Sequence, residues 1–87
     1  MNKKELMRDE LIGLPVKIIS SQDPRWDNKE GVIVDETKNT FIIKIDDKEK
    51  RIAKNIAVFE FIYDDKKIRI NGKEIMYRPE DRIKKIR

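Results

Sequence analysis

Two apolar runs joined by a short polar segment, between residues 31 and 45, constrain the fold more than any other feature of the sequence. Successive side chains of a strand point to opposite faces, so Val32 and Val34 share one face of the first run. In the second run, one face is shared by Phe41, Ile43 and Ile45. Residues 35–39 supply a turn, because Asp and Asn side chains bond nearby backbone amides. We therefore expect a β-hairpin with one face built for a core.

Further short strands are expected on both sides of this hairpin. They cover residues 16–20, 48–54, 56–63 and 74–77, with another strand around Ile68 and Ile70. Turn residues separate the strands, at Asp46-Asp47, at Asp64-Asp65 and at Asn71-Gly72, which is a strong type I′ signal. Gly31 marks a bulge or a sharp bend at a barrel corner. The pattern favours a mainly β fold, a closed or nearly closed antiparallel meander of roughly five or six strands.

A short helix is expected at the N-terminus. Asn2 followed by Glu5 resembles a capping box. The apolar residues at helical spacing after it are Leu6, Met7, Leu11 and Leu14. Gly13 can provide a left-handed stop, so a helix in residues 1–14 should end near Ile12. Its apolar stripe either packs on the mouth of the barrel or docks on a partner subunit.

A second helix is expected in residues 78–87. Pro79 suits the first turn of a helix, and acids at the start with bases at the end suit the helix dipole. With residues 16–77 forming the barrel, the 87 residues make one domain.

The composition narrows the possible chemistry. The chain has no Cys and no His, so it can form neither a disulfide nor a thiolate zinc site, and it lacks the usual general base. We predict no catalytic residue and no metal site in this chain. No apolar run approaches the length of a membrane span, and the N-terminus lacks a signal-peptide core, so we expect a cytoplasmic protein without membrane contact.

Basic residues in three places are candidates for binding RNA. In the expected strand 48–54, Lys48, Lys50 and Lys54 point to one side, and a row of cations can follow a phosphate backbone. The full candidate set is Lys38, Asn39, Lys48, Lys50, Arg51, Lys54, Arg78, Arg82 and Lys85. Simpler explanations stay open: a charged strand edge that prevents aggregation, ordinary turn chemistry at Lys38 and Asn39, and a solubilising face on the C-terminal helix.

Two other features admit two interpretations. The Asp46-Asp47 and Asp64-Asp65 pairs could hold magnesium, but Asp is a favoured turn residue and turns are needed at both places. Trp26, in a polar loop, either plugs the edge of the barrel or offers a stacking surface to a base or an anchor to a partner.

Four segments together resemble the archaeal ribonuclease P protein component 1 family. They are residues 10–17, 31–40, 57–61 and 78–85, with the sequences ELIGLPVK, GVIVDETKNT, AVFEF and RPEDRIKK. The resemblance implies an Sm-like or SH3-like barrel in a ribonucleoprotein whose RNA, using magnesium, cleaves the 5′ leader from precursor tRNA. The chain would then be a non-catalytic subunit that binds no cofactor itself.

The resemblance also implies partners. They are the ribonuclease P RNA, a zinc-ribbon protein subunit, other ribonuclease P proteins and, as the substrate of the whole enzyme, precursor tRNA. The protein contact would come from the N-terminal helix, the strand from Gly31 to Val34 and the C-terminal helix. The residues expected there are Leu6, Met7, Leu11, Leu14, Gly31, Val32, Ile33, Val34, Ile83 and Ile86.

Three other functions compete with this one. The chain could be another small-barrel RNA-binding protein, such as a ribosomal protein or a subunit of an Sm-like ring. It could be a protein-only adaptor that uses the apolar face around Val58 and Ile62. Last, it could be a nuclease that uses the Asp pairs.

Overall fold

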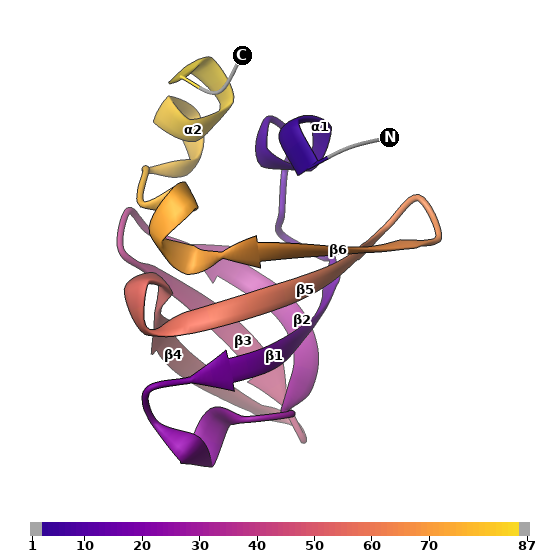
Figure 1. Cartoon of the computed structure of the whole chain (residues 1–87), viewed down its shortest axis with the longest axis vertical. Helices are drawn as coiled ribbons and strands as arrows, with labels where there is room; N and C mark the ends of the chain where they lie inside the picture. The colour runs from indigo at the N-terminus through magenta and orange to yellow at the C-terminus, as the bar shows by residue number, and fades with distance from the viewer. Residues whose placement is uncertain (1–2, 86–87) are drawn as a thin grey trace.

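The computed structural model describes residues 3–85, with the side chains of residues 5–84. Six strands form one antiparallel sheet in the order β4-β3-β2-β1-β5-β6 (Figure 1). The strands are β1 (Pro15–Ser21), β2 (Glu30–Glu36), β3 (Thr40–Ile45), β4 (Lys48–Ala53), β5 (Ala57–Tyr63) and β6 (Lys66–Asn71). The remaining elements are α1 (Lys3–Met7), η1 (Pro24–Trp26), η2 (Lys54–Ile56), η3 (Gly72–Ile75) and α2 (Pro79–Lys85). The expected mainly β fold is confirmed.

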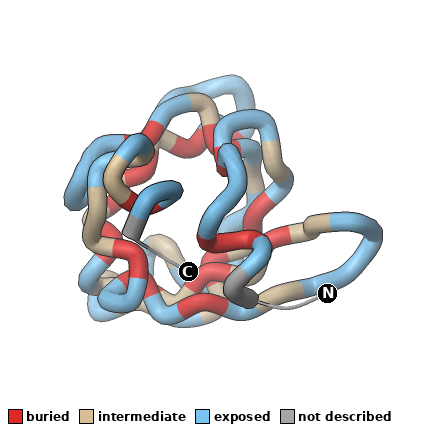
Figure 2. The backbone as a smooth tube through the Cα atoms, turned by 90° about the horizontal axis from the view of Figure 1, so that it is seen from above, coloured by how far each residue is buried: buried red, intermediate tan, exposed pale blue. Residues whose placement is uncertain are grey.

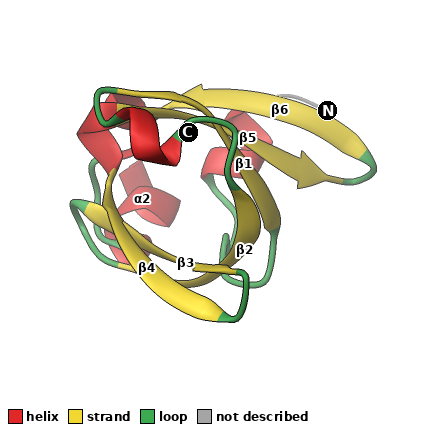
Figure 3. Ribbon diagram, turned by 90° about the horizontal axis from the view of Figure 1, so that it is seen from below, coloured by secondary structure: helices red, strands yellow, loops and turns green. Residues whose placement is uncertain are grey.

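The sheet curls into a small barrel (Figure 3). Strand β1 pairs with β2 through Pro15, Val16 and Lys17, and with β5 along most of its length. In the described sheet β4 and β6 are the edge strands, and the 3₁₀ turns η2 and η3, which follow them, contact each other. Figure 1 shows α1 and α2 at the same end of the barrel. Neither described helix is long and apolar enough to cross a membrane.

The core lies inside the curled sheet. Every strand contributes buried residues, and these lie between less buried ones along the backbone (Figure 2). The ring of Phe41 packs edge-on against Phe59 and Phe61, with centroids 5.1 and 6.0 Å apart, an arrangement that aromatic rings favour. On β5 the alternation of the expected strand places Ala57, Phe59 and Phe61 inward and leaves Val58 and Ile62 half-buried on the other face.

Strand β2 faces the opposite way from the prediction. Val32 is 39% exposed, whereas Ile33 is fully buried. Ile33 pairs with the buried Ile43 on β3, and directly opposite residues of a sheet share a face. The register then shifts between Ile33 and Asp35, so that Glu36 also points inward. Alternation could not choose the face, because both faces of this strand carry apolar residues.

Two glycines allow backbones to approach closely. A Cβ on Gly31 would overlap the carbonyl oxygen of Lys44, so this glycine allows β2 and β3 to approach each other closely. The irregularity in β2 lies further along the strand, between Ile33 and Asp35. A Cβ on Gly72 would overlap the carbonyl oxygen of Lys54. The predicted type I′ turn at Asn71-Gly72 and the strand over residues 74–77 are wrong. Asn71 instead caps η3, its side-chain oxygen accepting from the Lys73 amide at 3.0 Å.

The two Asp pairs form the tight turns that were expected. Asp46, Asp47, Asp64 and Asp65 all have positive φ angles, between 50° and 66°. Each pair joins two directly paired strands, and positive φ at both central residues is the requirement of a type I′ turn. Among the described residues no group of three or more acids is placed to hold a metal ion.

The N-terminal helix is shorter than predicted, while the C-terminal helix matches its prediction as far as Lys85. Helix α1 ends at Met7, and the carbonyl oxygens of Met7 and Asp9 accept hydrogen bonds from Arg82. Gly13 does adopt a left-handed conformation, with φ of 94°, but only after a non-helical segment. The proposed capping residue Asn2 lies outside the described residues.

We predict that Gly72→Ala lowers the free energy of unfolding by about 3 kcal/mol or more, because the added methyl group forces η2 and η3 apart. Urea denaturation measures the loss. Gly13→Ala is the control: its Cβ would meet no atom within 4 Å, so only backbone strain of about 1–2 kcal/mol is expected. Equal losses in the two variants would contradict the close-approach explanation.

Candidate nucleic-acid interface

A buried carboxylate stands where the sheet and α2 meet. The side chain of Glu36 is fully buried and contacts two fully buried cations, Lys54 and Arg82. Lys54 Nζ donates to Glu36 Oε2 at 2.9 Å. Arg82 donates from Nε to Oε2 at 3.1 Å and from Nη2 to Oε1 at 2.9 Å, a bidentate contact. Charge-assisted, bidentate contacts of this kind are among the stronger hydrogen bonds in proteins.

Main-chain oxygens accept from Nη1 of Arg82 and from the two remaining hydrogens of Lys54 Nζ. Arg82 Nη1 donates to the carbonyls of Met7 and Asp9, each at 2.6 Å. Lys54 Nζ donates to the carbonyls of Ile75 and Tyr77, at 2.9 and 3.0 Å. No buried side-chain nitrogen or oxygen in the described part of the chain lacks a partner. The Glu36–Lys54–Arg82 network thus joins β2, η2 and α2 to the segments that follow α1 and η3.

Burial affects the pKa of Lys54. Desolvation lowers the pKa of the Lys54 ammonium below its ordinary value, while the hydrogen bond to Glu36 opposes that shift. The ammonium also lies 4.9 Å from the centroid of the Phe41 ring, a distance at which a cation is attracted to an aromatic face. The contacts with Glu36 therefore partly offset the cost of burying this charge.

The assignment of Lys54 and Arg82 to RNA binding is wrong. Both side chains are fully buried and occupied by Glu36 and by carbonyl oxygens, so a phosphate cannot reach them. Strand β4 ends at Ala53, and Lys54 therefore leaves the row that strand alternation predicted. The sequence signal that could have revealed the network is Glu36, an acid at the end of a buried strand.

Other predicted RNA contacts are accessible. Lys38 and Asn39 are exposed at the tip of the β2–β3 hairpin, and Lys48, Arg51 and Arg78 are exposed elsewhere. Lys50 is half-buried on β4. The side chain of Lys85 lies outside the described residues. The role of these residues in RNA binding stays a prediction.

The structure adds a second basic edge that the sequence reasoning missed. Lys66, Lys67 and Arg69 are exposed on the edge strand β6, and Arg69 Nε contacts Glu60 at 2.9 Å. The signal was present in the sequence, because β6 has three bases and no acid in its six residues.

The two edge strands carry most of the positive charge of the sheet. Strand β4 has three bases and one acid, and β6 has three bases and no acid, whereas β2, an inner strand, has three acids and no base. Cations on edge strands discourage pairing with another chain, and they also attract a polyanion. The charge distribution therefore places a candidate nucleic-acid interface along the two edge strands β4 and β6, which we call the rims.

The predicted protein-contact residues divide into two groups. Leu6, Met7, Leu11 and Ile33 belong to the core, so their side chains are not available to a partner and that part of the prediction is wrong. The accessible group is Val32 and Ile83, which are exposed, with Leu14, Gly31 and Val34, which are half-buried. Ile86 lies outside the described residues. Trp26 is half-buried against the core, which fits its role as a plug of the barrel edge.

A tyrosine tethers the segment after α1 to the sheet. Tyr63 Oη donates to Asp9 Oδ2 at 2.6 Å. This bond raises the pKa of Tyr63 to about 12. The same bond, with the amide of Glu10, holds the pKa of the Asp9 carboxyl below its usual value. The Tyr63–Asp9 hydrogen bond and the Glu36–Lys54–Arg82 network hold the same segment, since Arg82 also donates to the carbonyl of Asp9.

Comparison with known proteins decides the family. The model of a family described as ribonuclease P/MRP, subunit p29, matches residues 4–85. The chain belongs to this p29 family. The membership predicted from four sequence segments is thereby confirmed, and it makes the chain a ribonuclease P protein subunit.

Relatives of this p29 family member are similar over almost its whole length. Ribonuclease P protein component 1 of Thermococcus sibiricus is 51% identical over 98% of this chain and 69% of its own length. The protein of the same name from Methanocaldococcus jannaschii is 42% identical over 92% of this chain and 85% of its own. A solved structure, Mth11, a homologue of human RNase P protein Rpp29, matches with a TM-score of 0.63 and 42% identity, over 86% of this chain and 99% of that one. The barrel-type fold is shared with that structure.

We predict that Glu36→Gln lowers the free energy of unfolding by about 3–5 kcal/mol, because it leaves two buried cations without a counter-charge. Chemical denaturation measures the loss. Asp35→Asn makes the same chemical change on an exposed neighbour and should cost less than about 0.5 kcal/mol. A Glu36→Gln variant as stable as Asp35→Asn would show that the network contributes nothing to stability.

A pH-dependent effect is expected for Tyr63→Phe. The variant should be less stable than the wild type near neutral pH, because Asp9 loses its hydrogen-bond donor. The raised pKa of Tyr63 means that this contribution is present below the ordinary tyrosine value of 10.0 and is lost as the pH rises through about 12. The lowered pKa of Asp9 means that it is also lost as the pH falls below the ordinary value of 3.8.

The measurement is the difference in free energy of unfolding between wild type and Tyr63→Phe as a function of pH. Tyr77→Phe is the matched control, since in the described residues the Tyr77 hydroxyl makes no hydrogen bond. Only its main-chain groups do: the carbonyl accepts from Lys54 and the amide donates to the carbonyl of Ile75. A difference that stays constant across the alkaline and acidic ranges would contradict the tether.

Proposed function

We propose that this chain is a non-catalytic, RNA-binding subunit of ribonuclease P, supporting a catalytic RNA that uses magnesium to remove the 5′ leader from precursor tRNA. Membership of the p29 family supports the proposal that the chain is part of ribonuclease P. The observation that carries RNA binding is the concentration of exposed bases on both edge strands. Phosphate contacts dominate the affinity of proteins for nucleic acids, and these rims present cations that are not held inside the fold.

The proposed RNA contacts extend over both rims, the hairpin tip and the residue before α2. They are Lys38, Asn39, Lys48, Lys50, Arg51, Lys66, Lys67 and Arg78. Arg69 is left out because Glu60 already neutralises it. A surface made mainly of lysines positions a phosphate backbone and carries little base specificity, which suits a subunit that supports a folded RNA.

A supporting role fits the residues of the chain. It contains neither His nor Cys, and its buried carboxylate is enclosed by two cations that hold the fold together. The proposed division of labour therefore leaves cleavage and the magnesium ions to the RNA, and the chain requires no cofactor. We place this assembly in the cytoplasm.

The proposed protein partner is a zinc-ribbon subunit of the same enzyme. A shallow groove bordered by Pro15, Gly31, Val32 and Ile62 exposes apolar side chains on the outer face of the sheet, and exposed apolar patches mark protein contacts. This surface retains the accessible part of the predicted contact, on the strand from Gly31 to Val34. The buried Leu6, Met7 and Leu11 play no part in it.

The salt dependence of RNA binding tests the rims. Three double substitutions to Ala remove two positive charges each: Lys48 with Arg51 on β4, Lys66 with Lys67 on β6, and Lys29 with Lys44 as the control outside both rims. Each lost phosphate contact lowers the slope of log K against log salt by about 0.7–0.9. We expect each rim pair to lower it by about 1.4–1.8 and the control pair to leave it nearly unchanged.

Reconstitution with the catalytic RNA and the zinc-ribbon subunit tests the function itself. Adding the wild-type chain should lower the magnesium requirement for cleaving precursor tRNA, and the two rim variants should do so less effectively. No change on adding the chain, or cleavage by the RNA-free chain, would rule out the proposed role. Equal slopes for rim and control pairs would remove the rims from the interface.

A further inference from the structure

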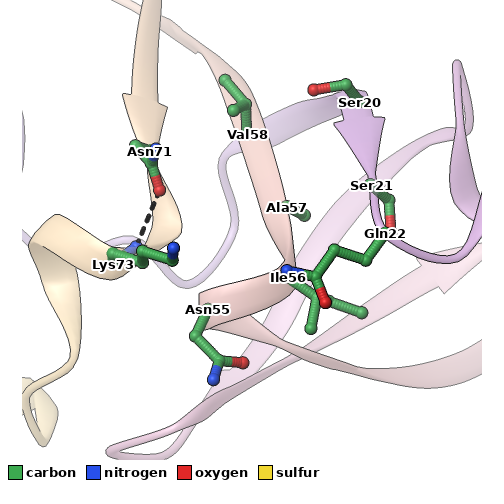
Figure 4. Close-up of a pocket in the computed structure, with 9 residues that line it drawn as sticks. All are labelled: Ser20, Ser21, Gln22, Asn55, Ile56, Ala57, Val58, Asn71 and Lys73. Atoms are coloured by element: carbon green, nitrogen blue, oxygen red, sulfur yellow. Dashed lines mark hydrogen bonds between the residues drawn. The ribbon is translucent and has the colours of Figure 1, made fainter.

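A small groove lies where β1 ends and β5 begins, beside the end of β6. Its volume is about 240 Å³. Pockets for drug-sized ligands usually measure about 300–1,000 Å³, so this groove suits a smaller group. Ile56, at the end of η2, supplies apolar surface together with Ala57 and Val58 of β5, and the remaining lining residues are polar (Figure 4).

The walls of the groove are fixed by main-chain contacts. The amide of Gln22 donates to the carbonyl of Ile56 at 2.8 Å, which holds the end of β1 beside the start of β5. Gly72, lacking a Cβ, allows η3 to approach the carbonyl of Lys54, and this approach brings Lys73 to the same groove as Asn55. Asn71 Oδ1 is occupied by the Lys73 amide, so the NH₂ group of Asn71 remains as a donor.

The polar groups of the groove are available. Within the described residues, the side chains of Ser20, Gln22, Asn55 and Lys73 take part in no hydrogen bond or ion pair of the fold. Each amide offers a donor beside an acceptor, the pattern that pairs with the edge of a base. No acid lines the groove, although the chain has 17 Asp and Glu residues. The groove is therefore suited to an anionic ligand that also has a flat apolar face.

We propose that this groove binds one unpaired nucleotide of single-stranded RNA. The base lies against Ile56 and Val58, with its edge toward Gln22 and Asn55, and Lys73 faces the phosphate. A base inside a duplex cannot enter, because its edge is already paired and its faces are stacked, and recognition of RNA by sequence usually targets unpaired bases. This inference rests on the proposed RNA-binding function and adds a specific nucleotide site to the phosphate contacts of the rims.

Backbone-amide NMR of the full chain tests the site. The chain is titrated with a short single-stranded RNA of mixed sequence and, separately, with an RNA duplex of equal length. We expect the single strand to shift the amide signals of Ser20, Gln22, Asn55 and Lys73, and the duplex to shift only signals of the rims.

A charge introduced into the groove gives the affinity test. Asn55→Asp keeps the shape of the side chain but turns an amide into an anion, and Asn28→Asp makes the same change outside the groove. Losing one hydrogen bond weakens binding about two- to tenfold, so Asn55→Asp should weaken single-strand binding by at least that factor. Asn28→Asp should change it less than about twofold.

The outcomes separate this inference from the proposed function. Shifts confined to the rims, with equal affinities for Asn55→Asp and Asn28→Asp, would overturn the nucleotide site and leave the RNA-binding role intact. Groove shifts caused by the zinc-ribbon subunit but not by RNA would assign the groove to a protein and overturn the proposal. If the chain binds no RNA and has no effect in reconstitution, both the nucleotide site and the proposed function are overturned.

Discussion

The carboxylate of Glu36, buried between Lys54 and Arg82, is the interaction on which the rest of the structure depends. A charged group buried alone is very unfavourable, so it persists only if its counter-charges and hydrogen bonds are all in place. Here the two cations bring their own elements to the barrel, η2 and α2. Helix α2 has seven described residues, too few to be stable in isolation, and Arg82 gives it a fixed position.

The network also decides where positive charge meets solvent. Arg82 and Lys54 are buried, so neither the C-terminal helix nor the predicted basic row of residues 48–54 presents all of its bases to solvent. The cations that remain accessible include those of the two edge strands and the hairpin tip. A row of cations on an edge strand points to solvent and discourages pairing with another chain. An RNA-binding role and protection from aggregation are thus served by the same residues.

The turn η2 serves both the interior and the surface. Lys54 points inward to Glu36, while Asn55, the next residue, lines the groove at the end of β6. Gly72 supports both arrangements, because its close approach to the carbonyl of Lys54 fixes η3, whose Ile75 carbonyl accepts from Lys54 and whose Lys73 reaches the groove. Stability and the proposed nucleotide site therefore share a scaffold of two short 3₁₀ turns.

Sequence by itself determined the features that depend on local pattern: the alternation that buries Phe59 and Phe61, the tight turns at the Asp pairs, the helix that begins at Pro79 and the family. Tertiary structure alone decided which face of β2 is inside, since both faces are apolar and only pairing with Ile43 chooses Ile33. It also decided that Lys54 and Arg82 stabilise the fold, because a cation can be identified as buried only once its ion-pair partner, here Glu36, is known. Glu36 lies 18 residues from Lys54 and 46 from Arg82 in the chain, separations over which neither periodicity nor local charge pattern carries information.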